Sequence, residues 1–366
     1  MSSKISLAID EDLLDALGQA VPGQKSPLSL LNVKGTGKVA AEKMARLQSA
    51  GIIDAVGNVK QDYRQVLDAL AKARNVSTLK YTAGSRLFEF IVSFPESKSS
   101  PSISVFHDGN QLIIEAPASV EKAFTLIDQN VGHSKLASSS FSGILSTEEA
   151  MAVFALMDLE RAANLRAIAG GTALKSGAFE LSAIIGKVIN RKDSFQSLEF
   201  VLQSRLDLAA PPTSAQIESG LKSLVDKKLV VQEGSKYHLS KELSHFAGRL
   251  PIIDNYVTIE SGRLDPNDKL IFASFTALQA GVNDILYLEN RDQEVVVRSV
   301  SGMQLVGLIA KFLNEPDAIK LPNAANKTSQ PTQATSANPK KYCKECGTAL
   351  EPSSKFCPNC GNKISP

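Results

Sequence analysis

Four cysteines near the end of the chain constrain its fold more than any other feature. The 366 residues contain no other cysteine, and these four form two CxxC pairs separated by ten residues: Cys343, Cys346, Cys357 and Cys360. Each CxxC turn can place two thiolates ~2.3 Å from one ion, so two such turns complete a tetrahedral site suited to zinc. The spacing therefore predicts one structural zinc ion held by all four cysteines.

The segment around the cysteines is predicted to be a zinc ribbon over residues 342–364. Gly347 and Gly361 follow the two pairs, where the chain must turn so that backbone N–H groups can face sulfur. Two disulfides or a thioredoxin-like redox pair are weaker alternatives, because a reducing cytosol disfavours disulfides and no βαβ pattern surrounds either CxxC. Four ligands leave no open position, which indicates a structural site rather than a hydrolytic one.

A polar linker precedes the ribbon. Residues 322–341 read PNAANKTSQPTQATSANPKK and include no large apolar side chain. Such a segment cannot bury enough surface to offset the entropy of ordering, so we expect a flexible, disordered tether. The ribbon is then a module appended to a body of about 320 residues.

The charge balance excludes some classes of partner. Lysine and arginine number 40 against 38 aspartates and glutamates, a net charge of +2. This balance favours neither a nucleic-acid coat nor a polybasic membrane binder. The longest uncharged apolar stretch in the C-terminal half, residues 270–283, is shorter than the ~20 residues of a membrane helix. The first twelve residues contain no apolar signal segment, so we expect a cytoplasmic protein without membrane contacts.

The body contains two stretches of similar apolar pattern. Residues 41–70 parallel residues 218–250, with Leu47 matching Leu224. Apolar periodicity is shared by many unrelated segments, so this match alone does not require an internal duplication.

A second parallel strengthens the first. Residues 103–127 match residues 285–309 without a gap, and Val105 falls on Tyr287. Each copy then consists of two helices, a strand region, a tight hairpin and a closing amphipathic helix. Asp108-Gly109-Asn110 is a hairpin signal in the first copy. An ungapped match of 25 residues favours an internal duplication.

The sequence thus predicts an α+β fold with two pseudo-repeated domains that contain winged-helix-like helices and antiparallel sheet. Asp10 and Ser146 are expected to cap helices whose first turns are acidic. The predicted boundaries are 1–132 for repeat 1, 145–320 for repeat 2, 322–341 for the linker and 342–364 for the ribbon.

Residues 195–240 are similar to the recognition helix and wing of a winged helix. Two short strands, residues 230–232 and 237–239, would flank Gly234. Residues 214–228 carry three lysines against Glu218 and Asp226, too little positive charge for strong phosphate neutralisation. Winged helices also serve as protein-interaction modules, so weak or no nucleic-acid binding is expected.

No catalytic constellation is evident. Residues 33–40, VKGTGKVA, fail two of the four fixed positions of a P-loop and are better explained as a helix entry. The four histidines show no metal-ligand spacing: His107, His133, His238 and His245. No GxSxG motif is present, and the cysteines all belong to the ribbon. The chain is therefore predicted not to be an enzyme.

The body also resembles a known family. Residues 47–57, the helix at 59–70, the hairpin and the closing helix look like the cytosolic chaperones of type VII secretion, the EspG family. The resemblance is a periodicity that covers much of residues 38–313. It implies two related α+β halves that hold a secretion substrate without catalysis, and hence a protein-binding platform.

Two functions follow as hypotheses. The first is a non-enzymatic cytoplasmic adaptor or chaperone, whose body binds an unidentified protein and whose tethered ribbon makes a second contact. The alternative is a winged-helix and zinc-ribbon transcriptional regulator that binds nucleic acid. The sequence does not identify the partner, the binding surface or the oligomeric state.

Overall fold

The computed structural model divides the chain into two compact units, Met1–Pro322 and Asn323–Pro366. Each unit is described by itself. The described residues are 4–32, 41–83, 86–95, 100–173, 177–190, 194, 196–206, 212–281, 283–291 and 294–315, and the backbone of 341–342 and 349–350.

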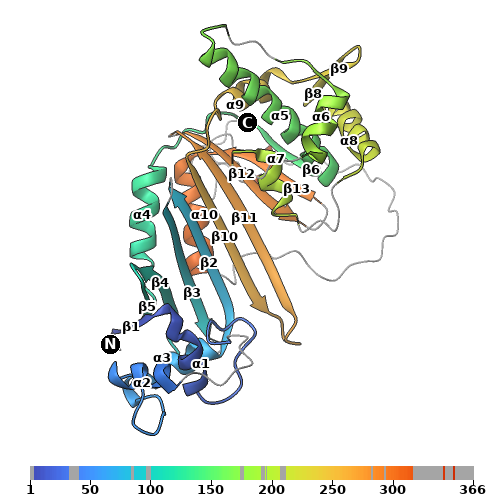
Figure 1. The fold of residues 1–366 in the computed structure, drawn as a ribbon. Coiled ribbons are helices and arrows are strands. Elements are labelled where there is room, and N and C mark those ends of the chain that lie inside the picture. Colours follow the sequence, from blue (N-terminus) through green and yellow to red (C-terminus); the bar gives the residue numbers. More distant parts are fainter. Residues whose placement is uncertain are drawn as a thin grey trace. The chain divides into compact units, whose positions relative to one another are not determined.

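The first unit is built on one antiparallel sheet, which contains ten strands among the described residues. Its strands lie in the order β1 (Ile5–Asp10), β5 (Gln111–Ala116), β4 (Ile103–Asp108), β3 (Arg86–Pro95), β2 (Ala73–Ala83), β10 (Asn255–Leu264), β11 (Leu270–Ala280), β12 (Asp284–Arg291), β13 (Glu294–Val300) and β6 (Ser142–Ser146). The sheet is continuous across its middle, where β2 pairs with β10 and Thr78 lies opposite Glu260 (Figure 1).

One face of the sheet is covered by α4 (Glu121–Val131) and α10 (Gly302–Asn314), which contact each other. Helix α10 also contacts both β2 and β10, so it spans the middle of the sheet. The apolar stripe of each helix packs against alternate strand residues, as period-2 alternation requires. The strand residues in this core include Leu79, Tyr81, Phe90, Phe106, Ile259, Phe275, Ile285 and Tyr287.

The opposite face carries two groups of helices. Over the N-terminal strands lie η1 (Glu11–Leu13), α1 (Leu14–Ala20), α2 (Ala41–Ser49) and α3 (Gln61–Ala71). Over the C-terminal strands lie α5 (Thr147–Ala169), α6 (Leu181–Ile189), α7 (Leu198–Gln203), α8 (Ser214–Asp226) and α9 (Lys241–Gly248). A small second sheet accompanies the C-terminal group, with the strand order β7 (Phe179–Glu180), β9 (Lys236–Leu239), β8 (Val230–Glu233).

Helix α5 is the centre of the C-terminal group, and it contacts α6, α7, α8 and α9. Its apolar residues lie on all sides, so no side of its middle turns faces water. The helix begins at a capping box in which Ser146 accepts from the Glu149 N–H and the Glu149 carboxylate accepts from the Ser146 N–H. The predicted cap at Ser146 is therefore confirmed. Asp10 stands at the start of η1 without a side-chain cap bond, and it pairs instead with Arg46 at 2.7 Å.

The predicted hairpin at Gly109 and the predicted pair of strands around Gly234 are present. β4 and β5 join at a turn where Gly109 has φ +62°, and β8 and β9 join where Gly234 has φ +61°. Glycine adopts this left-handed conformation without the steric cost that other residues pay.

The proposed match of Val105 to Tyr287 is wrong in detail. Leu47, Leu224, Val105 and Tyr287 are all buried. However, Val105 packs under α1–α3, whereas Tyr287 packs under α4 and α10 on the other face of the sheet. A one-residue error in strand register transfers every side chain to the opposite face, so residues 103–116 and 285–298 do not superpose without a shift.

The second unit is described only at two short strands. β14 (Lys341–Tyr342) pairs with β15 (Ala349–Leu350), with Tyr342 opposite Ala349. The linker residues 322–340 and all four cysteines lie outside the described residues, as does the segment 33–40. Within the described ranges, no helix combines the length and apolarity needed to cross a bilayer.

Candidate functional site

The predicted metal ligands cannot be placed, because the four cysteines lie outside the described residues. In the sequence, the first CxxC pair falls between the residues of β14 and those of β15. Among the described residues, no group of three or more His, Cys, Asp or Glu side chains is placed to hold a metal ion. His133 and His238 instead each lie near one carboxylate, at 2.8 Å from Asp128 and 3.3 Å from Glu233.

A cavity of about 500 Å³ in the first unit, lined by described residues, is a candidate binding site. It lies among α5, α6, the residues that precede α7 and the segment that precedes β10. The lining residues combine charged, hydroxyl, amide and apolar side chains: Asp158, Arg161, Ala162, Leu165, Lys187, Ser194, Gln196, Ser197, Pro251 and Ile252.

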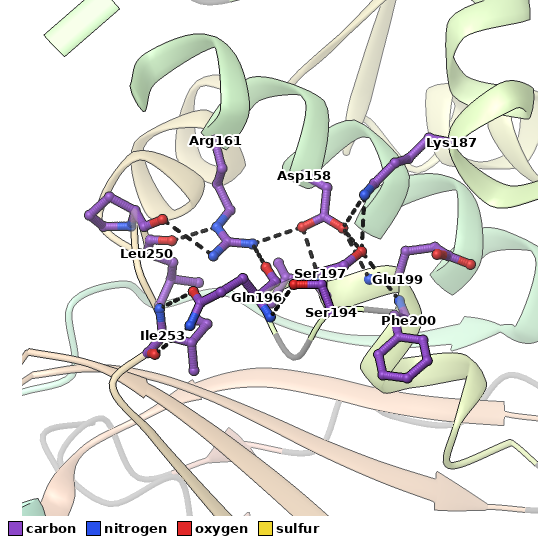
Figure 2. A network of polar contacts seen from close by, with 12 residues as sticks. Asp158, Arg161, Lys187, Ser194, Gln196, Ser197, Glu199, Phe200, Leu250 and Ile253 are labelled. Carbon is purple, nitrogen blue, oxygen red and sulfur yellow. Dashed lines mark hydrogen bonds and ion pairs between the residues drawn. The ribbon is translucent and has the colours of Figure 1, made fainter. Parts of the chain in front are cut away.

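Asp158 lines this cavity and lies in the middle of a network of polar contacts, which Figure 2 shows. Its carboxylate accepts from the Ser197 hydroxyl at 2.6 Å and from the N–H groups of Leu198 and Glu199 at 3.0 and 3.3 Å. It therefore binds N–H groups in the first turn of α7, which have no partner inside that helix. This one carboxylate therefore joins the start of α7 to α5.

Arg161 lies one turn after Asp158 and connects three chain segments. Its Nη1 donates to Asp158 at 2.8 Å and to the Gln196 carbonyl at 2.7 Å, and its Nε donates to the Leu250 carbonyl (Figure 2). Both Asp158 and Arg161 are almost fully buried. Buried charges are costly unless they are paired and hydrogen-bonded, and here both conditions are met.

The amide of Gln196 completes this network. It donates to the Ile253 carbonyl at 2.8 Å and accepts from the Ile253 N–H at 2.7 Å, a pair of bonds that imitates a strand pairing. Together, Gln196 and Arg161 fix the segment 250–253 beside α5. These contacts join residues 35 and 89 positions apart in the sequence.

Lys187 and Ser197 define the chemistry available. The Lys187 ammonium donates to the Ser197 hydroxyl at 3.0 Å and lies 3.5 Å from the Asp158 carboxylate. The Ser197 hydroxyl donates a hydrogen bond to Asp158 and accepts from Lys187 and from the Phe200 N–H, so its donor and both lone pairs are used within the protein.

The mouth of the cavity is apolar. Leu165 and Ile252 line it with 38% and 55% of their surfaces exposed, and Ile168 is exposed one turn beyond Leu165 on α5. Three large apolar side chains are therefore exposed at or near this concave site. Lys187 contributes a partly exposed cation beneath this rim.

This site was missed from the sequence. One signal was present: the run AMAVFALMDLERAANL, residues 150–165, places Asp158, Glu160 and Arg161 within an otherwise apolar helix. Charged residues in a helix that is apolar on all sides must be paired inside the protein. Their partners could not be identified, because most of them are backbone groups distant in sequence.

The winged-helix-like segment offers little free positive charge. On α8, Lys222 pairs with Glu218 at 2.8 Å, and Lys227, which follows the helix, pairs with the buried carboxylate of Glu149 at 2.6 Å. Burial pushes the pKa of Glu149 upward, but bonds from Lys227, Ser223 and the Ser146 N–H outweigh it and lower the pKa. The lysine at 227 thus holds α8 against α5.

Comparison with protein families identifies the C-terminal module. A family model described as a zinc-ribbon domain matches residues 342–364, the segment predicted from the cysteine spacing. No curated protein matches the chain. Zinc-ribbon domains generally bind zinc, which agrees with the expected cofactor.

Proposed function

We propose that the chain is a non-enzymatic cytoplasmic adaptor or chaperone that binds another protein through the cavity described above. The observation that carries this proposal is the exposed pair Leu165 and Ile252 in a cavity whose polar network already has its partners. Such a surface gains free energy by burying an apolar side chain and needs no rearrangement to do so.

The cavity also limits the chemistry of the partner. Among the described lining residues, the cations are Arg161 and Lys187, and the one anion, Asp158, is already paired with both. A Lys187 ammonium has three N–H donors, of which two lie near Ser197 and Asp158. A partner segment with an apolar side chain next to a carboxylate fits both the rim and the remaining donor.

The ribbon is proposed as a second contact module with one structural zinc ion on Cys343, Cys346, Cys357 and Cys360. Four thiolates are a donor set that zinc prefers in structural sites, and the first CxxC pair falls in sequence between the paired strands β14 and β15. When bound, the ion supplies folding energy rather than chemistry. The linker raises the effective concentration of the ribbon at a partner held by the body.

We further propose that the body arose by duplication, as the resemblance to the type VII secretion chaperones implies. The order of strands supports this: from the middle of the sheet outward, β2, β3, β4, β5, β1 parallels β10, β11, β12, β13, β6. After α2, residues Ile53 and Val59 form an isolated bridge, and Val230 and Leu239 pair at the equivalent place after α8. The predicted domains 1–132 and 145–320 would be these two copies.

A winged-helix regulator is the second candidate. The strand order β7, β9, β8 beside α6 and α8 favours it, because the third strand of a winged helix lies between the other two. The ion pairs of Lys222 and Lys227 oppose it, since phosphate contacts require free cations. We therefore expect weak duplex binding that salt removes.

Site-specific crosslinking in native cells tests the leading proposal. A photo-reactive residue at position 252 should capture one recurring protein, and the same residue at the exposed position 56 should not. Leu165→Ser should abolish the capture at 252 without changing the melting temperature. Capture of nucleic acid at 252, or equal capture at 56 and 252, would refute the adaptor function of this site.

A further inference from the structure

The large sheet has a bare edge in its second half. β12 pairs with β11 only from Phe275 to Ala280, whereas β10 pairs with β11 from Leu270 onward. Among the described strands, residues 270–274 of β11 therefore have a partner on one side only. Figure 1 shows β10 and β11 running past the ends of β12 and β13. We call residues 270–274 the free edge.

The direction of the backbone groups at the free edge follows from the turn before it. The Asp265 N–H donates to the Lys269 carbonyl at 2.9 Å, so the backbone N–H and C=O groups of Lys269 point toward β10. In an antiparallel ladder, successive residues point their N–H and C=O groups to alternate sides. The N–H and C=O groups of Leu270, Phe272 and Ser274 therefore point away from β10. The pairing of Phe275 with Glu289 uses the Ser274 carbonyl, whereas both groups of Leu270 and Phe272 and the Ser274 N–H have no partner in a described strand.

The side chains of the free edge are apolar and exposed. Phe272 is 58% exposed and lies opposite Gly262, where a Cβ would come within 3.1 Å of its ring. The ring thus covers the glycine, and Leu28 packs on the same spot. Between Leu270 and Ser274 there is no charged residue, although exposed edges are usually protected by charge, proline or a bulge.

A second bare stretch provides a contrast. β3 pairs with β4 only from Phe90 to Ser93, so residues 86–89 also have one paired side among the described strands. That stretch begins with Arg86 and ends with Glu89, and Leu87 between them is 64% exposed. Its charges discourage strand pairing, so it serves as an internal control.

We propose that the free edge accepts an extended segment of a partner protein by strand addition. The segment has apolar side chains at alternate positions, is uncharged opposite Leu270 and Phe272, and carries a carboxylate near Lys269. Backbone bonds to Leu270, Phe272 and the Ser274 N–H supply affinity, and the two apolar side chains supply specificity. This surface is separate from the cavity at Asp158, so it extends the proposed function without depending on it.

The small size of the free edge favours a flexible segment over a second copy of the chain. Two free edges would align five residues each, about 17 Å of strand. Stable protein interfaces bury about 1,200–2,000 Å² in total, which so short a pairing does not approach. An extended peptide needs no more than this edge to bind weakly and reversibly.

Amide hydrogen exchange on the full chain tests the first half of the proposal. The amides of Leu270, Phe272 and Ser274 should exchange at least ~100-fold faster than those of Ile271 and Ala273, which point toward β10. Slow exchange at every protein concentration would show that the chain covers its own edge. Slow exchange only at high concentration, with a dimer in sedimentation, would identify a second copy. Either result overturns the proposal.

A peptide probe tests the second half. The probe has one Asp followed by alternating Val and Thr, and its control is the same peptide N-methylated at each Val. The probe should bind the full chain and slow exchange at Leu270, Phe272 and Ser274 at least ~10-fold, and the control should do neither. Because backbone pairing tolerates many sequences, failure of the probe to bind at millimolar concentration overturns the proposal.

Two substitutions separate strand addition from nonspecific adsorption. Ser274→Pro removes an N–H that points away from β10 and no bond to β10. It should lower the affinity for the probe at least ~10-fold. Phe272→Thr should do the same, whereas Leu87→Thr on the control stretch should have no effect. Unchanged melting temperatures show that the variants fold. Probe binding that survives both Ser274→Pro and Phe272→Thr contradicts the proposal.

Discussion

Gly220 of α8 lies directly against the backbone of Glu148 in α5. A Cβ on Gly220 would stand 2.8 Å from both the carbonyl carbon and the carbonyl oxygen of Glu148. The two helices therefore pack at a separation that only glycine allows, and Ser223 and Lys227 bind the Glu149 carboxylate beside this contact.

Gly220→Ala should lower the free energy of unfolding by about 1–3 kcal/mol, because the backbone of α5 cannot move away like a flexible side chain. Gly307→Ala is the matched control. Gly307 is exposed in α10 and has no neighbour within 4 Å of a built Cβ, so alanine there should stabilise by about 1 kcal/mol. Urea unfolding of both variants measures the difference, and equal effects would contradict the close approach.

Asp158→Asn should destabilise the first unit by about 3–5 kcal/mol, because it leaves the buried Arg161 guanidinium without its carboxylate. Glu218→Gln breaks the exposed pair with Lys222 and should cost less than about 0.5 kcal/mol. In a double variant with Arg161→Met, the losses should be far from additive. Additive losses would show that the two residues act separately.

Glu160→Gln should change the pH dependence of stability. Burial raises the pKa of Glu160, and the bond from Ser244 and the proximity of His238 offset this only in part. A raised pKa means that this group stabilises the fold below its unfolded pKa and loses that contribution as pH rises through the folded value. The variant should therefore match the wild type near pH 4 and exceed it near pH 7.5.

Unfolding curves at these two pH values test this prediction, with the exposed Glu121→Gln as the control. A gap between Glu160→Gln and wild type that widens toward low pH would reverse the sign and show that the ionised form is favoured.

The ribbon should hold one zinc ion. Native mass spectrometry of the reduced chain should show one bound zinc, and Cys343→Ser or Cys360→Ser should release it. The melting transition of the body should not move, because the ribbon belongs to a separate compact unit. Freshly purified protein without metal would disprove the zinc assignment.

Turns and helix caps could be predicted from short sequence motifs. The turns at Gly109 and Gly234 and the cap at Ser146 depend on neighbours within a few residues, so they could be predicted from those residues alone. The cysteine spacing identified the ribbon for the same reason.

Long-range structure could not be derived in this way. β4 is buried on both faces, so Val105 and Phe106 give no alternation from which to assign a face. The site at Asp158 was missed because its partners include backbone N–H groups of residues 198 and 199, whose place beside α5 depends on the fold. Nothing in the sequence of either strand predicts that Thr78 pairs with Glu260.

That central pairing bears on how the chain is made. β2 is complete once residue 83 has been synthesised, but its partner β10 begins only at Asn255. At 5–20 residues per second, a ribosome takes on the order of ten to thirty seconds to supply the residues between them. Throughout that interval one side of β2 has no strand to pair with. A nascent chain of this protein therefore presents an adhesive strand during synthesis, and we expect it to require protection by a ribosome-associated chaperone until the second half emerges.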